Sequence, residues 1–125
     1  DQPGASRYFL GGMVAYSDSA KIRHLNVPSD LLAREGAVSK PVAEAMALGV
    51  AAEFGATAGI GITGVAGPGG GSEEKPVGTV WYSASLEGVV SSRLERFLGD
   101  RALVRERAGQ AAMALLLGIL EGRTP

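Results

Sequence analysis

The residues best suited to chemistry begin with a tyrosine and a lysine that lie five positions apart. Tyr16 and Lys21 bracket the stretch Tyr-Ser-Asp-Ser-Ala-Lys, and Thr63 follows an apolar run that ends at residue 62. A lysine accepts a proton only in its neutral form, which burial or a nearby cation favours. A tyrosine hydroxyl can relay a proton or hold the amine. On spacing alone, a surface tyrosine and a solvated lysine are the more common outcome.

A glycine-rich loop follows Thr63. Residues 61–80 contain seven glycines and two prolines. Glycine reaches positive φ without a steric penalty, so successive amides can converge on an anion. The loop lacks the Gly-Lys-Ser/Thr ending of a P-loop and does not open a helix as a dinucleotide fingerprint does. A flexible linker is the alternative. Because Pro68 and Pro76 stiffen the segment, we favour a binding loop.

Two arginines and one histidine complete the candidate set. Arg101 and Arg105 lie four residues apart in the last predicted helix. They could pair with a phosphate, or they could form the solvated side of that helix. His24 is expected to be exposed, and the chain has no cysteine. We therefore expect no metal site.

The pattern of apolar residues predicts the elements that position these side chains. In the predicted helix at 39–55, Ser39 is the expected N-cap, Pro41 fits the first turn and Gly55 fits the C-terminus. Its apolar residues are expected to form one stripe facing a sheet: Val42, Ala43, Met46, Ala47, Val50 and Phe54. The full set is a strand at 8–16, a helical turn at 18–25 ended by Asn26 and Pro28, a helix at 39–55, a central strand at 56–62, a hairpin of strands at 79–86 and 89–97 joined by Glu87 and Gly88, and a helix capped by Asp100. This order predicts a three-layer α/β/α domain with a mixed sheet.

Composition limits the classes of function. The chain has 125 residues, 46% of them hydrophobic and 20% charged, which fits one domain. Twelve basic and thirteen acidic side chains give a net charge of −1, so we expect no general attraction for nucleic acid. Charges and glycines interrupt every apolar run, the first residues do not resemble a signal peptide, and we expect a cytoplasmic protein without a membrane partner.

Four stretches carry a resemblance to a known family. They are GASRYFLGGMVAYSDSAK, GAVSKPVAEAMALG, GITGVAGPGGGSEEKPVGTVW and FLGDRALVRERA. Together they resemble the C-terminal domain of the CinA (competence/damage-inducible protein A) family, which includes nicotinamide-mononucleotide amidohydrolases. The resemblance implies hydrolysis of nicotinamide mononucleotide to nicotinate mononucleotide and ammonia in bacterial pyridine-nucleotide salvage. Members of the family carry their nucleophilic serine in an upstream Glu-Ser-Cys-Thr-Gly-Gly helix. This chain has no such string, so residues 1–125 are expected to be an incomplete and inactive domain.

The resemblance also implies roles for individual residues. Lys21, Tyr16 and Thr63 fall on catalytic positions of a Ser-Lys type amidase. The implied substrate-binding residues are Gly64, Ala66, Gly67, Gly70 and, from the last helix, Arg105 with Arg101 as the alternative. A small-molecule nucleotide is the implied partner, with no cofactor, and a homo-oligomer is possible. Two other readings stay open: a non-catalytic nucleotide- or phosphate-binding module, and an interaction domain linked to competence or DNA repair.

Overall fold

The structure is a computed structural model that describes residues 11–12 and 18–122. None of the described helices combines the length and apolar character that crossing a bilayer requires. The described elements are α1 Asp18–Leu25, α2 Ser29–Glu35, α3 Lys40–Phe54, β1 Ala58–Gly64, β2 Thr79–Leu86, β3 Val89–Arg96 and α4 Arg101–Leu120.

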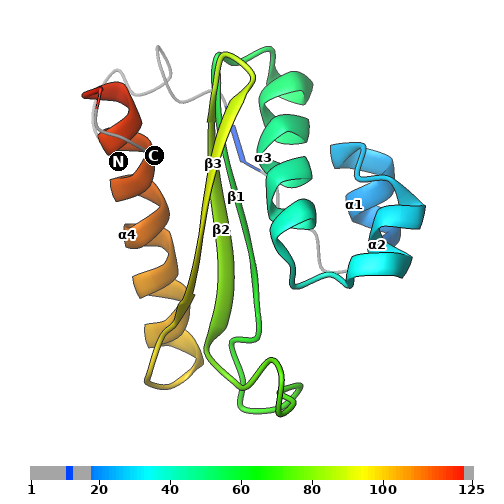
Figure 1. The fold of residues 1–125 in the computed structure, drawn as a ribbon, viewed down its shortest axis with the longest axis vertical. Helices are drawn as coiled ribbons and strands as arrows, with labels where there is room; N and C mark the ends of the chain where they lie inside the picture. The colour runs from blue at the N-terminus through cyan, green and yellow to red at the C-terminus, as the bar shows by residue number, and fades with distance from the viewer. Residues whose placement is uncertain (1–10, 13–17, 123–125) are drawn as a thin grey trace.

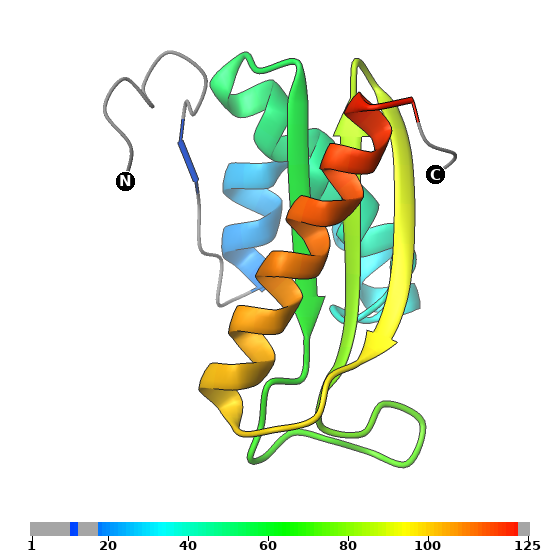
Figure 2. The ribbon, with the colours of Figure 1, turned by 90° about the vertical axis from the view of Figure 1, so that its left-hand side faces the viewer.

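The described elements form layers around a single sheet. The three described strands pair antiparallel in the order β1-β2-β3. Helix α3 covers one face of the sheet, and α1 and α2 pack on the outer side of α3 (Figure 1). Helix α4 crosses the opposite face, in front of the sheet in Figure 2. The predicted three-layer α/β class is therefore confirmed.

The described strands are all antiparallel, and the mixed character of the predicted sheet is not tested by them. The strand expected at 8–16 falls on residues that are not described, apart from Gly11 and Gly12. The strand expected at 56–62 is β1, displaced by two residues to Ala58–Gly64. It lies at the edge of the described sheet rather than at its centre.

Helix α3 has the predicted ends, but its apolar face divides between two neighbours. It follows Ser39 and ends at Gly55, which adopts a left-handed φ of 63°. Ala43, Ala47 and Ala51 lie against the glycines of β1, with the Met46 Cβ atom beside them. Val42 is instead buried against the α1–α2 layer, in a cluster that also contains Leu25, Val27 and Leu32. The predicted sheet-facing stripe is therefore right for the alanines and wrong for Val42.

Glycines in β1 let α3 approach the strand backbone. A Cβ atom at Gly61 would lie 2.7 Å from the Ala47 amide nitrogen and closer still to the Ala43 carbonyl oxygen. A Cβ atom at Gly59 would overlap the Ala47 carbonyl oxygen. The alternation of glycine in β1 with alanine in α3 therefore sets the distance between the helix and the sheet.

The hairpin of β2 and β3 has the predicted turn. Glu87 and Gly88 have φ values of 52° and 84°, the left-handed pair that matches strand twist in a two-residue turn. On the α3 side, the Ser92 hydroxyl donates to Glu44 Oε2 at 2.7 Å, and the Ser83 and Ser92 hydroxyl oxygens lie 2.7 Å apart. Because Ser92 uses its proton for Glu44, Ser83 is the donor in the second bond. A chain of hydroxyls thus links both strands to α3.

Helix α4 closes the opposite face. The Asp100 carboxylate accepts a hydrogen bond from the Leu103 amide at 2.9 Å, which confirms the predicted cap. The helix packs on the sheet through a core of Val80, Tyr82, Val104, Ala108 and Ala112.

The Tyr82 hydroxyl lies at the edge of this core and donates to Glu95. Burial and that hydrogen bond to a carboxylate raise the pKa of Tyr82 to about 12.

Candidate active site

Lys21 is buried. Only 7% of the residue is exposed, although lysine is among the residues least often found inside a protein. It lies on the same face of α1 as buried Leu25, while Ile22 and His24 are exposed. The solvated-lysine interpretation is therefore wrong. Tyr16, its expected partner, lies outside the described residues.

Thr63 lies near the end of β1 and faces the α3 side of the sheet. Its hydroxyl donates to the Ala37 carbonyl oxygen at 2.7 Å, and 7% of the residue is exposed. This bond ties the turn between α2 and α3 to the strand. Because the proton is used, the Thr63 oxygen remains able to accept a hydrogen bond from a ligand but not to donate one. Helix α1 packs on α3, so Lys21 and Thr63 belong to the same side of the sheet.

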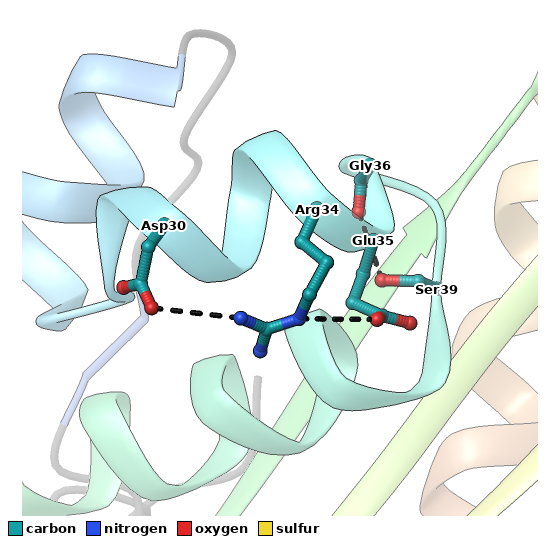
Figure 3. A network of polar contacts seen from close by, with 5 residues as sticks. All are labelled: Asp30, Arg34, Glu35, Gly36 and Ser39. Atoms are coloured by element: carbon teal, nitrogen blue, oxygen red, sulfur yellow. Dashed lines mark hydrogen bonds and ion pairs between the residues drawn. The ribbon is translucent and has the colours of Figure 1, made fainter.

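The turn held by Thr63 contains a local polar network (Figure 3). The Ser39 hydroxyl donates to the Gly36 carbonyl oxygen at 2.8 Å, so it does not cap α3 with its side chain. The Arg34 guanidinium lies 3.6 Å from the Asp30 carboxylate and 3.4 Å from that of Glu35. These ion pairs are exposed and add little stability. The Ser39 and Thr63 hydrogen bonds are the contacts that fix the turn.

The glycine-rich loop is an ordered extension of the β1–β2 hairpin. The Val65 amide donates to the Thr79 carbonyl oxygen at 2.9 Å, and the Gly78 amide donates to the Val65 carbonyl oxygen at 2.6 Å. Nearer the tip, the Ser72 amide donates to the Lys75 carbonyl oxygen at 2.9 Å. The linker alternative does not fit a loop that is closed at its base and bonded within its tip.

The loop reaches helix α4 through Gly67. This glycine has a φ of 81°, and its carbonyl oxygen accepts a hydrogen bond from Arg101 Nη1 at 3.3 Å. Ala66 packs against the core under α4. Gly70, with a φ of 88°, lies exposed at the tip. Gly64 is paired with Val80 at the end of the ladder.

The two candidate arginines differ in their contacts with the loop. Arg101 touches the loop, whereas no contact between the described loop and Arg105 is found, and Arg105 is exposed one turn further along α4. Of the predicted residues, Arg101 contacts Gly67, whereas Thr63 bonds Ala37 on the α3 side and Ala66 packs under α4.

Three residues near Thr63 escaped the sequence analysis. The Lys75 amine lies 3.4 Å from the position that a Cβ atom at Gly36 would take, so the loop folds back over the α2–α3 turn. Trp81 is the cross-strand neighbour of Thr63. Glu44 lies at the end of the hydroxyl chain. Only strand register could have found Trp81, and nothing in the sequence indicates the other two contacts.

An apolar cleft lies elsewhere. It has a volume of about 560 Å³ and lies beside β1, at the strand edge that pairs with no other described strand, and its lining includes Gly11, Gly12, Met46, Ile60 and Met113. Neither Lys21 nor Thr63 belongs to its lining. Because its walls offer few polar groups to orient a substrate, we place the candidate site at the glycine-rich loop.

The fold defines an α/β domain whose polar groups gather at the loop end of its sheet. Comparison with solved structures gives the same architecture. A competence or damage-inducible protein from Enterobacter asburiae is 34% identical with a TM-score of 0.89, over 95% of this chain and 75% of that one. Competence damage-inducible protein A from Klebsiella pneumoniae is 35% identical with a TM-score of 0.87, over 92% of this chain and 71% of that one.

The family follows from the sequence. Residues 1–120 match the model of the CinA C-terminal domain, and the chain belongs to this family. A CinA-like protein from Mycobacterium sp. (strain MCS) is 52% identical over 97% of this chain. The match covers 29% of that protein, so the chain spans less than a third of the length of this relative.

Proposed function

We propose that this chain belongs to an amidohydrolase that converts nicotinamide mononucleotide to nicotinate mononucleotide and ammonia. The observation that carries the proposal is the buried Lys21 on the side of the sheet to which Thr63 points. Lysine is rarely buried in proteins, so its burial here marks Lys21 as a candidate functional residue. Membership of the CinA C-terminal domain family supports the same class of reaction.

Each group has a defined task in carboxamide hydrolysis. A serine supplied by a segment outside this chain adds to the amide carbonyl carbon, and the resulting tetrahedral intermediate expels ammonia. Water then hydrolyses the acyl-serine ester, which releases nicotinate mononucleotide and restores the serine hydroxyl. Lys21 in its neutral form accepts the serine proton and returns it to the leaving nitrogen. The Thr63 oxygen accepts a hydrogen bond from the substrate. Arg101, already beside Gly67, offers its remaining N–H groups to the phosphate.

The test uses a longer protein that includes the segment preceding residue 1. We expect it to release ammonia from nicotinamide mononucleotide, whereas the 125-residue chain does not. Lys21→Met keeps the apolar volume of the buried side chain and removes the amine, so turnover should fall at least a thousand-fold while the melting temperature changes little. Lys40→Met is the matched control, because Lys40 is exposed at the start of α3.

Two results would refute the proposal. Ammonia release by the 125-residue chain would show that no outside serine is needed. Full turnover in Lys21→Met would remove the lysine from the mechanism. Salt-sensitive retention of the protein on DNA, without ammonia release, would instead favour the interaction-domain alternative.

A further inference from the structure

Trp81 lies in the centre of a row of side chains on the α3 face of the sheet. It is directly opposite Thr63 on β1 and Leu94 on β3. Residues opposite one another in an antiparallel ladder point to the same face. Since the Thr63 hydroxyl contacts Ala37 just before α3, the indole of Trp81 is on the α3 side, away from α4.

Exposure rises across this row from Thr63, which is 7% exposed, to Leu94 on the edge strand β3. One row further along, Ser83 is fully buried. Trp81 is only partly buried, and Leu94 is 53% exposed. A tryptophan left partly open beside a glycine-rich loop and a buried threonine has the position of a ligand contact, because an aromatic ring offers a large rigid surface at a small entropic cost.

A carboxylate stands beside this row. Glu44 accepts its hydrogen bond from Ser92, which occupies the row next to Leu94. Neighbouring rows on one face of a sheet are separated by two residues, or about 7 Å. Among the described residues, no hydrogen bond to the second Glu44 oxygen is found. The Lys75 amine lies toward the α2–α3 turn, where Ala37 accepts the Thr63 bond.

We propose that Trp81 and Glu44 form a subsite for a planar cationic aromatic ring. A tryptophan face attracts a cation through its ring quadrupole, and a carboxylate at the rim adds a favourable charge interaction. This inference rests on the proposed function in identifying the ring as the pyridinium of nicotinamide mononucleotide. Its phosphate is then directed toward the cationic groups Lys75 and Arg101 at the loop.

The test measures charge preference by calorimetry on the 125-residue chain. Nicotinamide mononucleotide carries a cationic ring, and its dihydro form carries a neutral ring on the same ribose phosphate. We expect the oxidised form to bind about ten-fold more tightly. Trp81→Leu and Glu44→Gln should each reduce this preference to about three-fold or less. Glu53→Gln is the matched control: an exposed glutamate of the same helix, which should keep the preference.

Fluorescence gives a second measurement, since Trp81 is the single tryptophan of the chain. The oxidised nucleotide should quench its emission along a curve that saturates at the calorimetric dissociation constant. Trp81→Phe keeps an aromatic face and should keep most of the charge preference. Far-UV circular dichroism before each titration ensures that every variant compared is folded.

The inference is overturned if the wild-type chain binds neither form, binds both equally, or keeps its preference in Trp81→Leu. It also fails if the longer protein releases ammonia and Trp81→Leu leaves its KM unchanged, a result that would leave the proposed function standing. If the longer protein prefers the oxidised nucleotide but releases no ammonia, the proposed amidohydrolase function is refuted and the ring subsite stands.

Discussion

Replacing Gly61 by alanine tests the contact between β1 and α3. The added Cβ atom would lie 2.7 Å from the Ala47 amide nitrogen and 2.9 Å from Met46 Cβ, below the 3.0 Å that real Cβ contacts respect. The nearest atoms belong to the helix backbone and cannot rotate away, so α3 has to move by several tenths of an ångström. Overpacking of this kind costs about 1 to 3 kcal/mol. Because the obstacle is backbone, we expect the upper part of that range, about 2 to 3 kcal/mol.

The assay is thermal and urea unfolding of the 125-residue chain, followed by circular dichroism. A loss of about 2 to 3 kcal/mol corresponds to a melting temperature lowered by about 6 to 15 °C for a domain of this size. Gly109→Ala is the control, because no described atom lies within 4 Å of its added Cβ. In the helix interior it should stabilise by about 0.5 to 1 kcal/mol. A Gly61→Ala protein as stable as the wild type would refute the close helix–strand contact.

Three further predictions concern other contacts. The pKa of Tyr82 is about 12 in the folded state against 10.0 for the free group, so folding favours the neutral phenol. The contribution of Tyr82 to the free energy of unfolding is therefore complete below pH 10 and is lost as the pH rises to 12. The free energy of unfolding is measured by urea at each pH between 10 and 12. Over this range it should fall by about 1 to 2 kcal/mol more in the wild type than in Tyr82→Phe, a value that allows for the solvent around exposed Glu95. If the free energy of unfolding falls equally in both proteins, the linkage to Tyr82 is wrong. Asp100→Ala removes the hydrogen bond to the Leu103 amide and should lower the free energy of unfolding by about 1 kcal/mol in the same assay. An unchanged free energy of unfolding would show that the cap is dispensable. Gly78→Ala combines a φ of 95° with overlap of the Phe97 carbonyl oxygen; we expect a loss of about 2 to 4 kcal/mol in thermal unfolding, and a wild-type melting temperature would exclude this backbone conformation.

The elements with strong local signals could be predicted from the sequence. Asp100 marks the start of α4, Gly55 the end of α3, and Glu87-Gly88 the hairpin, because each residue type is favoured by the local backbone geometry. Helix α2 escaped prediction because Pro28 reads as a stop signal, although it occupies the N-cap of the next helix. A proline can follow the end of one helix or precede the start of the next. Here the burial of Leu32 in the cluster with Leu25 and Val42 accounts for the second helix.

The sequence indicates candidate residue types for the site and does not indicate their contacts. Thr63 is one of these candidates, yet its hydrogen bond to Ala37 joins residues 26 positions apart. The division of the α3 face has the same origin. Val42 and Ala43 are both apolar and point in different directions around the helix, and the sequence does not reveal that Ala43 faces β1 while Val42 faces the α1–α2 layer. The packing of α1 and α2 on α3 gives Val42 an apolar surface of its own, apart from the sheet.

Backbone hydrogen bonds at the base of the glycine-rich loop separate its tip from the rest of the domain. Val65, Gly78 and Thr79 hold the two arms together before the tip begins, so the tip can gain or lose a residue without shifting the register of the strands. Length variation there is expected to change the exposed surface of the loop and to leave the free energy of folding nearly unchanged. Exposed positions around Gly69 and Gly70 are accordingly where an inserted epitope or a randomised library would be tolerated.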